Sequence, residues 1–382
     1  MPTTSRPPLL ANGLVYVDAH MPGWSRVKRG TNFRYRDVKG KWLQDVDEIS
    51  RIQRLAIPPA YTEVWICPLH NGHLQATGMD ARGRKQYRYH ADWRVLKDET
   101  KFERLEAFGR ALPKIRARVA RDLKTAGEML SRDRVLATLV RLLDTTFVRV
   151  GNEEYASSNG SYGLTTLRNQ HAAVRGSALK LSFRGKSGVM QEASLDDPRV
   201  AKVVRSCQQL PGQALFQYIG DDGAPHGVSS SDVNDYLRDA AGNGFTAKDF
   251  RTWHGTVQAL ELTRLACDHN ESALEDAAAA RYSAKDIIGA VAKQLGNTPA
   301  VCKKSYVHPA VLSLGGQLSS DPAGMQAVWK SISGRGTQGA SRLRAAEARL
   351  LAFLSSERRR AARAQRGSAS TRRTASGSTV TA

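Results

Sequence analysis

The stretch Cys302-Lys303-Lys304-Ser305-Tyr306-Val307-His308-Pro309 places a tyrosine at the end of a short basic segment, three residues before a proline. Thr298-Pro299 precedes it, and these residue types are typical of a helix N-cap and of the first helical position. We therefore expect a short helix that begins after Thr298 and ends at Tyr306. A single tyrosine is a weak signal. Isolated cations in three upstream segments give it weight: Arg149, Lys186 and Arg251.

The first of these cations follows a predicted helix, residues 131–148, whose apolar residues recur at helical spacing. Ser131 is its expected N-cap. Gly151 and Asn152 are expected to end it, so Arg149 would lie at its C-terminal edge. An arginine there can bind an anion, or it can simply complement the negative end of the helix dipole.

The other two cations lie in a hairpin and in a capped helical segment. Residues 178–195 have the clearest hairpin pattern in the chain, and Lys186 lies at its tip between two glycines. Thr246 is expected to cap the segment that contains Arg251. A lysine at a hairpin tip is usually just solvated, and it acquires a function only where something acidic docks onto the tip.

The residues before these segments predict a separate β-rich domain. Residues 1–29 are interpreted as an irregular leader, and residues 30–95 as a mostly antiparallel sheet with hairpins at 33–43 and 63–78. The rest is predicted to form a mainly helical domain, a C-terminal helix and a disordered basic tail, at 96–335, 336–357 and 358–382. The expected fold class is therefore α+β.

The last strand of the β-rich domain combines cations with aromatic residues. Period-two alternation puts Gln86 and Arg88 on one face and Lys85, Tyr87 and Tyr89 on the other. Cations neutralise phosphates, while glutamine and tyrosine can reach base edges or sugars. An ordinary solvated strand with core-facing tyrosines is the alternative. The candidate DNA contacts of this segment are Arg82, Arg84, Gln86, Tyr87, Arg88 and Tyr89.

The charge of the chain predicts a polyanionic partner. Its 57 Lys+Arg and 36 Asp+Glu give a net charge of +21, and only seven of the arginines lie in the tail, residues 358–382. The folded part is therefore basic as well, which favours nucleic acid. A ribosome-like or merely soluble basic protein is the alternative.

Other chemistries find no support in the sequence. The four cysteines are far apart, which argues against a zinc site or a disulfide framework. No segment has the apolar length of a membrane helix or the core of a signal peptide, so we expect no membrane partner and a cytoplasmic protein. Neither a Walker-type phosphate loop nor paired carboxylates at metal-binding spacing occur, so we expect no cofactor and no metal.

Together, these segments resemble the type IB DNA topoisomerases, in their small poxvirus-like bacterial form. The resemblance covers about residues 30–315, and the order and separation of its short segments make it specific. The segments are Gln86-Tyr87-Arg88-Tyr89, Arg149-Val150-Gly151-Asn152-Glu153-Glu154-Tyr155, Gly163-Leu164-Thr165-Thr166-Leu167, Gly185-Lys186, Lys248-Asp249-Phe250-Arg251-Thr252 and Lys303-Lys304-Ser305-Tyr306.

The resemblance implies both a fold and a reaction. The β-rich domain and a catalytic domain shared with tyrosine recombinases would form a C-shaped clamp around duplex DNA. Tyr306 would attack a phosphodiester and become linked to the 3′ phosphate. Arg149 and Arg251 would hold the nonbridging oxygens, and Lys186 would protonate the 5′-hydroxyl leaving group. The free strand would swivel, relaxing positive and negative supercoils without ATP or metal, before the 5′ hydroxyl reseals the nick.

The resemblance also assigns supporting roles. Asn297 stands nine residues before the tyrosine, where the family often has a histidine that supports a phosphate oxygen. Its amide would donate a neutral hydrogen bond to that oxygen, or it only shapes the turn before the short helix. A monomeric enzyme on double-stranded DNA of the nucleoid is implied. Further implied DNA contacts are Tyr155, Lys248, Lys303 and Lys304.

Two other functions compete with this interpretation. A site-specific tyrosine recombinase shares the catalytic domain. It usually has a helical N-terminal domain and a histidine three residues before the second arginine, where this chain has Lys248. A non-enzymatic architectural DNA-binding protein would explain the charge alone. Relaxation by a monomer without paired sites separates the enzyme from a recombinase, and a tyrosyl–DNA adduct separates it from an architectural protein.

Overall fold

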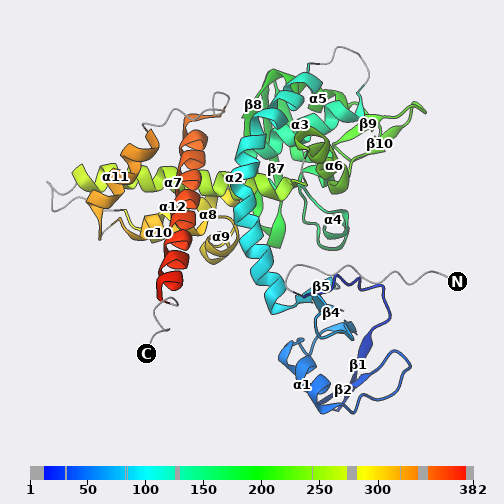
Figure 1. Cartoon of the computed structure of the whole chain (residues 1–382). Helices are drawn as coiled ribbons and strands as arrows, with labels where there is room; N and C mark the ends of the chain where they lie inside the picture. The colour runs from blue at the N-terminus through cyan, green and yellow to red at the C-terminus, as the bar shows by residue number, and fades with distance from the viewer. Residues whose placement is uncertain are drawn as a thin grey trace, which may run out of the picture. The chain divides into compact units, whose positions relative to one another are not determined.

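The computed structural model describes residues 13–30, 32–81, 83, 85–124, 130–242, 244–272, 282–318, 320–333 and 343–375. The chain divides into two compact units, Met1–Lys101 and Phe102–Ala382. The first is built on an antiparallel sheet and the second is mainly helical (Figure 1), as the sequence predicted. The long helix α2, Ala91–Asp122, contains the boundary between the units, which the sequence placed after residue 95.

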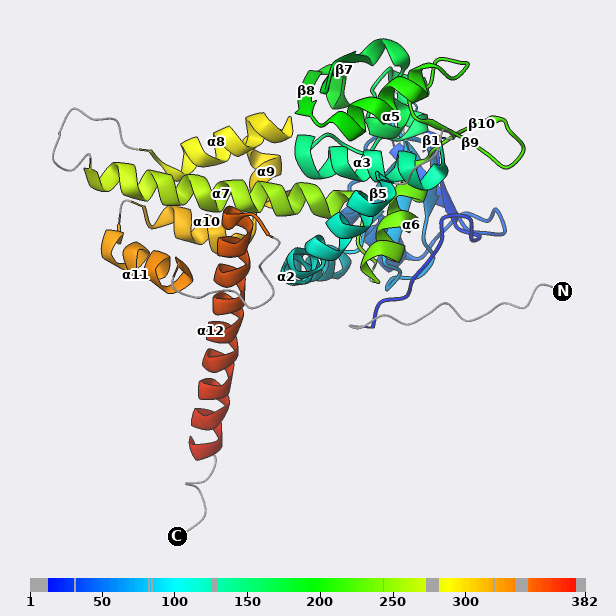
Figure 2. The same cartoon turned by 90° about the horizontal axis from the view of Figure 1, so that it is seen from above.

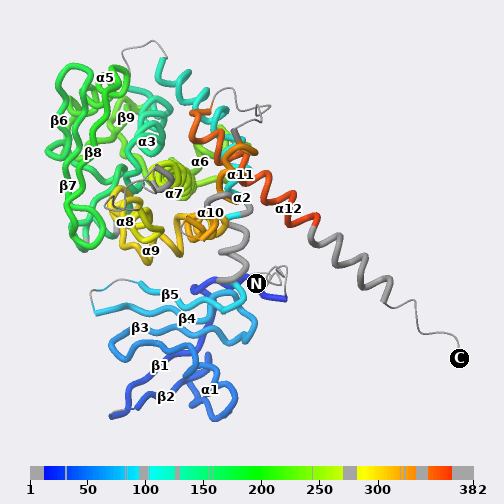
Figure 3. The backbone as a smooth tube through the Cα atoms, turned by 90° about the vertical axis from the view of Figure 1, so that its left-hand side faces the viewer, coloured from blue at the N-terminus to red at the C-terminus, as the bar shows by residue number. Residues whose placement is uncertain are grey.

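The first unit is a five-stranded antiparallel sheet with the strand order β2-β1-β3-β4-β5 (Figure 3). Its strands are β1 Trp24–Arg29, β2 Asn32–Arg36, β3 Thr62–Ile66, β4 Leu74–Met79 and β5 Lys85–Tyr89. The helix α1, Val46–Arg54, begins where the Asp45 carboxylate accepts hydrogen bonds from the backbone N–H groups of Asp47 and Glu48. The buried core between the sheet and α1 comprises Tyr35, Ile52, Val64, Ile66 and Ala76, and a second buried cluster comprises Val17, Cys67 and Leu74.

The strand register divides the side chains of this sheet between two faces. Directly paired residues share a face. The pairings therefore place Arg36, Ser25, Trp65, Thr77 and Tyr87 in one row across all five strands. We call this face the open face, because α1 packs on the opposite one.

Strand β5 follows the predicted alternation. Tyr87 and Tyr89 lie on the open face, and their rings stack with centroids 6.1 Å apart. Arg88 pairs with Ala76 and so lies on the α1 face with Gln86. The two faces of β5 therefore present different chemistry, as expected from the sequence.

Strand β1 corrects the predicted irregular leader. β2 pairs with β1 over five residues, whereas Trp42, its expected hairpin partner, makes only an isolated bridge with Arg36. Arg26 occupies a position of β1 on the α1 face, where its guanidinium donates to three carbonyls of residues 57–61 and lies 4.2 Å from the Phe33 ring centroid. A cation at an inward position hides the apolar alternation that identifies a strand.

The second unit is arranged around the long helix α7, Ala247–Ser272. Figure 2 shows α8 and α9 on one side of α7 and α10 and α12 on the other. A three-stranded sheet of order β6-β7-β8 carries the predicted hairpin. The remaining elements are α3 Arg132–Thr146, α4 Glu153–Asn159, β6 Ala172–Arg175, β7 Ala178–Arg184, β8 Met190–Asp196, α5 Pro198–Gln208, β9 Gln217–Ile219, β10 Pro225–Gly227, α6 Ser230–Ala241, α8 Ala284–Leu295, α9 Pro299–Ser305, α10 Pro309–Gly316, α11 Pro322–Ser333 and α12 Ala345–Ala375.

The end of α3 differs from the expectation. The helix stops at Thr146, and Phe147 adopts the left-handed conformation with φ 60°, so Arg149 lies in the loop beyond the helix. Asn152 does not end α3. Its side chain accepts from the backbone N–H of Tyr155 and caps α4 instead. Asparagine suits both ends of a helix, which is why the sequence alone misassigned it.

The C-terminal helix is longer than expected. α12 extends to Ala375, so residues 358–375 continue a helix where the sequence predicted a disordered tail. Arginine and alanine are strong helix formers, and extending an existing helix is easier than starting one. The rest of the predicted tail, residues 376–382, lies outside the described residues. Among the helices that are described, none combines the length and apolar character needed to span a membrane.

Candidate active site

Tyr306 lies at the end of α9, as the sequence predicted. Thr298 caps this helix, with its hydroxyl 3.4 Å from the backbone N–H of Val301, and Pro299 takes the first position. Tyr306 is the C-cap residue, and its backbone N–H donates to the Cys302 carbonyl. The short helix therefore fixes where the tyrosine leaves the backbone.

Helix α7 packs directly against the backbone of Tyr306. A Cβ on Gly255 would lie only 2.9 Å from the Tyr306 carbonyl oxygen, so the glycine permits a very close approach. The buried Thr256 hydroxyl lies 3.2 Å from the same carbonyl oxygen and also 3.2 Å from the backbone N–H of His308, from which it accepts. The tyrosine thus rests on the same helix that carries Arg251.

Arg251 is buried, with 4% of its surface exposed, and it points toward Tyr306. Its Cζ lies 5.1 Å from the centroid of the tyrosine ring. Its two terminal nitrogens donate to the carbonyls of Phe147 and Leu295, the latter at 2.7 Å. Its Nε is buried and, within the described part of the chain, makes no hydrogen bond. These contacts orient the guanidinium.

Arg149 lies in the loop after α3, and its guanidinium is close to Arg251 and Tyr306. Burial, followed by the nearby Arg251 guanidinium, lowers the pKa of Arg149 to about 10, while Tyr306 and Cys302 act in the opposite direction. Arg149 is therefore still charged at neutral pH. Two cations that repel each other beside a phenol form a site suited to an anion that neutralises both.

Asn297 positions Arg149 in this structure. Its Oδ1 accepts from Arg149 Nη2 at 2.5 Å, and the carbonyl of the neighbouring Gly296 accepts from the same nitrogen at 3.1 Å. The Asn297 amide also lies beside the Cys302 thiol and lowers its pKa, although burial has the larger effect and raises it. Its Nδ2 is buried and makes no hydrogen bond of normal geometry to any described residue.

Lys186 occupies the tip of the β7–β8 hairpin and is exposed. Figure 3 shows this hairpin reaching the region of α8 and α9. The contact is made by Gln191, whose side chain lies against two glycines. A Cβ on Gly185 would lie 2.6 Å from Gln191 Cγ, and one on Gly296 would lie 2.7 Å from Gln191 Oε1. Sequence reasoning missed Gln191, because nothing along the chain links it to Gly296.

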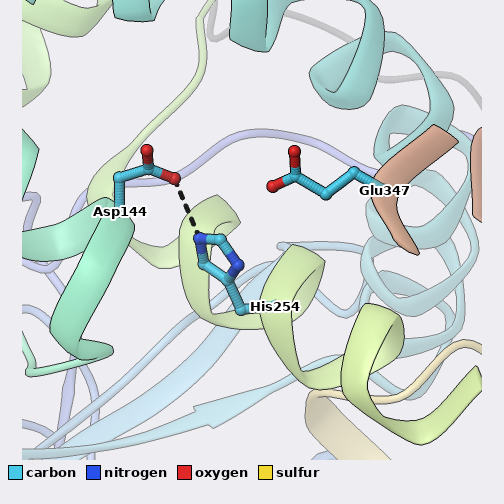
Figure 4. Close-up of side chains that lie close together, drawn as sticks. All are labelled: Asp144, His254 and Glu347. Atoms are coloured by element: carbon cyan, nitrogen blue, oxygen red, sulfur yellow. Dashed lines mark hydrogen bonds and ion pairs between the residues drawn. The ribbon is translucent and has the colours of Figure 1, made fainter. Parts of the chain in front are cut away.

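A buried charged cluster lies one turn along α7 from Arg251. Figure 4 shows Asp144, His254 and Glu347, whose ligand atoms lie within 4.8 Å of one another. His254 Nε2 lies 3.0 Å from Asp144 Oδ1. The arrangement resembles a metal site, but Arg116 donates to both carboxylates, at 2.8 and 2.9 Å to Asp144 and at 2.8 and 2.7 Å to Glu347. Its guanidinium supplies the positive charge that a metal would bring, so we interpret the cluster as structural.

The predicted DNA contacts fall into three groups. Tyr87, Tyr89 and Tyr155 are exposed, as are the lysines Lys248, Lys303 and Lys304. Gln86 and Arg88 are engaged within the protein, where Gln86 Nε2 donates to Asp80 at 3.0 Å and Arg88 Nη2 donates to the Ala56 carbonyl at 3.2 Å. Arg82 and Arg84 lie outside the described residues.

Of the five predicted catalytic residues, the structure brings four into direct proximity. Arg149, Arg251 and Tyr306 interact with one another, and Asn297 hydrogen-bonds to the first of these. Lys186 lies on the hairpin that packs against Gly296 through Gln191. The site therefore combines a phenol, two oriented guanidinium groups and an exposed lysine on a neighbouring tip.

Two family models match the chain. The model for the catalytic core of eukaryotic DNA topoisomerase I matches residues 90–318. The model for the N-terminal domain of bacterial DNA topoisomerase IB matches residues 32–80. The boundary between the two matches lies close to the boundary between the two structural units.

Individual proteins are similar as well. The chain is 33% identical over 308 residues to the DNA topoisomerase 1B of Acanthamoeba polyphaga mimivirus, covering 78% of this chain and 89% of the viral protein. It is 24% identical over 249 residues to the DNA topoisomerase 1B of Vaccinia virus (strain Copenhagen), covering 62% and 71%. A DNA topoisomerase 1 of Mycosarcoma maydis is 26% identical over 195 residues, covering 45% of this chain and 19% of that protein.

Proposed function

The chain belongs to the type IB DNA topoisomerases and is a DNA topoisomerase I, and we propose that Tyr306 is the nucleophile with which it cleaves one DNA strand. The Tyr306 Oη attacks phosphorus, the bond to the 5′ oxygen breaks, and the phenolic proton passes to solvent. The phosphodiester energy is retained in the 3′-phosphotyrosyl ester. Because that energy drives resealing, strand rotation between the two steps requires no nucleotide hydrolysis.

The two arginines stabilise the charge that develops during this transfer. Arg149 and Arg251 bind the nonbridging oxygens, which become more negative in the transition state. The observation that carries the proposal is that both arginines lie close to Tyr306. The Cζ of Arg251 is 5.1 Å from the centroid of the tyrosine ring. Arg149 interacts electrostatically with both Arg251 and Tyr306. Asn297 holds Arg149 and offers its Nδ2 as a further donor to the phosphate.

Lys186 acts as the general acid. A 5′ alkoxide is a poor leaving group, and proton transfer from a positioned side chain typically contributes about 10²–10⁴-fold. The proton moves from Lys186 Nζ to the 5′ oxygen as the bond to phosphorus breaks, and it returns when the 5′ hydroxyl attacks the tyrosyl ester. The position of the hairpin tip beside the α8–α9 region supports this role.

The test uses supercoiled plasmid with EDTA and without ATP. The unmodified protein should relax supercoils of both signs and form an adduct through a 3′ phosphate. Tyr306→Phe should abolish relaxation and adduct formation while DNA binding survives, and Tyr282→Phe, which alters an exposed tyrosine of the same unit, should retain both. A Tyr306→Phe protein that still nicks DNA would refute the assignment.

We also propose that the two units form a C-shaped clamp around duplex DNA and that the catalytic unit shares its fold with the tyrosine recombinases. Exposed tyrosines on β5 of the first unit and exposed lysines on α9 of the second support a contact from each. We further propose a monomeric enzyme that acts on nucleoid DNA in a bacterial cytoplasm, and the match to a bacterial domain model supports the bacterial part of this proposal. Sedimentation of the free and DNA-bound protein tests the monomer, and relaxation without paired sites excludes a recombinase.

A further inference from the structure

Three arginines of the first unit surround one tryptophan. The guanidinium carbons of Arg34, Arg36 and Arg29 lie 4.4, 4.5 and 5.5 Å from the ring centroid of Trp42. All three arginines are exposed, and Trp42 is half-buried. We call these four residues the β2 patch, because β2 supplies two of the arginines.

The β2 patch lies on the open face of the sheet, at the edge opposite β5. Arg36 begins the row that ends with Tyr87, and Arg34 lies on the same face two residues earlier in β2. With strands about 4.8 Å apart, the four steps from β2 to β5 span about 19 Å. Residues Met21–Gly23 cover Trp65 in the middle of the row. The exposed side chains of the row are therefore those of Arg36 and Ser25 toward one edge and of Tyr87 at the other.

The patch is not neutralised within the part of the chain that the structure describes. None of its arginines makes an ion pair to a described carboxylate. The nearby Asp37 accepts instead from the backbone N–H groups of Lys39 and Lys41. An arginine stacked on an aromatic ring keeps its N–H edge free, and that fork matches a phosphate oxygen pair. Like charges held together in this way are suited to a polyanion.

We propose that the β2 patch binds the phosphate backbone of the DNA duplex on which the enzyme acts, beyond the segment contacted by β5. This inference rests on the proposed function, because it assigns the tyrosines of β5 to the same duplex. A span of about 19 Å corresponds to five or six base pairs at about 3.4 Å each. The patch is therefore an outer contact that fixes the register of the duplex and reads no sequence.

The experiment compares the full chain with Arg29→Ala/Arg34→Ala/Arg36→Ala in DNA binding at 50 to 200 mM salt. Each phosphate contact contributes about 0.9 to the slope of log affinity against log salt, so three lost contacts flatten the slope by about 2.7. Over this range the affinity of the unmodified protein should fall about 40-fold more than that of the variant. Lengthening the duplex by six base pairs should tighten binding of the unmodified protein only.

A matched control is Arg54→Ala, which removes an exposed arginine of α1 on the other face of the sheet, compared with Arg34→Ala. Only Arg34→Ala should change the slope. Tyr306→Phe removes the proposed nucleophile and no phosphate contact, so its salt slope should equal that of the unmodified protein. The proposed function is therefore judged by nicking in Tyr306→Phe, and the patch by the salt slope of the triple variant. An unchanged slope in the triple variant would overturn the proposal. It would also be overturned if the triple variant bound one duplex as the unmodified protein does and lost the ability to bind an additional, separate duplex.

Discussion

Replacing Glu347 tests how strongly the C-terminal helix stabilises the catalytic unit. Glu347 is 1% exposed, and its carboxylate accepts two hydrogen bonds from Arg116. It also accepts from the backbone N–H of Arg344 at 3.0 Å. Glu347→Ala would leave the Arg116 guanidinium, whose side chain is 19% exposed, paired with Asp144 alone.

The expected cost follows from burial. Removing one partner of a buried ion pair costs about 3–5 kcal/mol, because the other partner stays desolvated without its counter-charge. At about 2–4 °C per kcal/mol for a large domain, the melting temperature of the catalytic unit should fall by roughly 6–20 °C. Calorimetry of the full chain measures this shift.

The matched control lies on the same helix. Glu357 pairs with Arg360 at the surface, where the side chains are 34% and 80% exposed, so Glu357→Ala should cost less than about 0.5 kcal/mol. A Glu347→Ala protein that melts within about 2 °C of the unmodified protein would refute the reasoning. That result would mean that the buried cluster adds nothing to the attachment of α12.

Three further predictions concern the active site. Gly255→Ala should slow single-turnover cleavage by up to about 10²-fold, because the new Cβ would push the Tyr306 carbonyl away; a cleavage rate equal to that of the unmodified protein would show that the contact is not limiting. Gln191→Ala should slow cleavage of ordinary DNA but not of DNA with a bridging 5′ sulfur, whose thiolate leaves without the proton that we propose Lys186 supplies; equal slowing on both substrates would contradict this. Burial lowers the pKa of His308 to about 4, so its contribution to stability is complete above about pH 6.5 and is lost as the pH falls toward 4. Melting temperatures across this range should fall less steeply for His308→Gln, and parallel curves would rule the histidine out.

Much of the architecture was predictable, because it depends on local patterns. The β3–β4 and β7–β8 hairpins, strand β5 and the short helix before Tyr306 all follow from alternation, turn residues or caps that lie within a few residues of one another. The family followed from the order of several short segments, and the comparisons confirm it.

What the sequence could not supply are contacts between distant segments. Arg26 looks like a surface cation until the carbonyls of residues 57–61 are seen around it. Gln191 is an ordinary strand residue until Gly296 is placed beside it. Asn297 was expected to face a phosphate, and the structure adds that its oxygen holds Arg149. In each case, the partner lies at least about 30 residues away.

The pairing of Arg116 with Glu347 also affects when the core of the second unit can be completed during synthesis of the chain. The two residues are 231 positions apart. At about 5–20 residues per second, a ribosome needs roughly 10–50 s to make the intervening chain. During that interval, helix α7 with Arg251 has been made, but Arg116 still lacks one of its two carboxylate partners. A nascent polypeptide therefore contains the residues that we propose for catalysis before Arg116 has both of its buried partners, so the core of the second unit is complete only once α12 has been made.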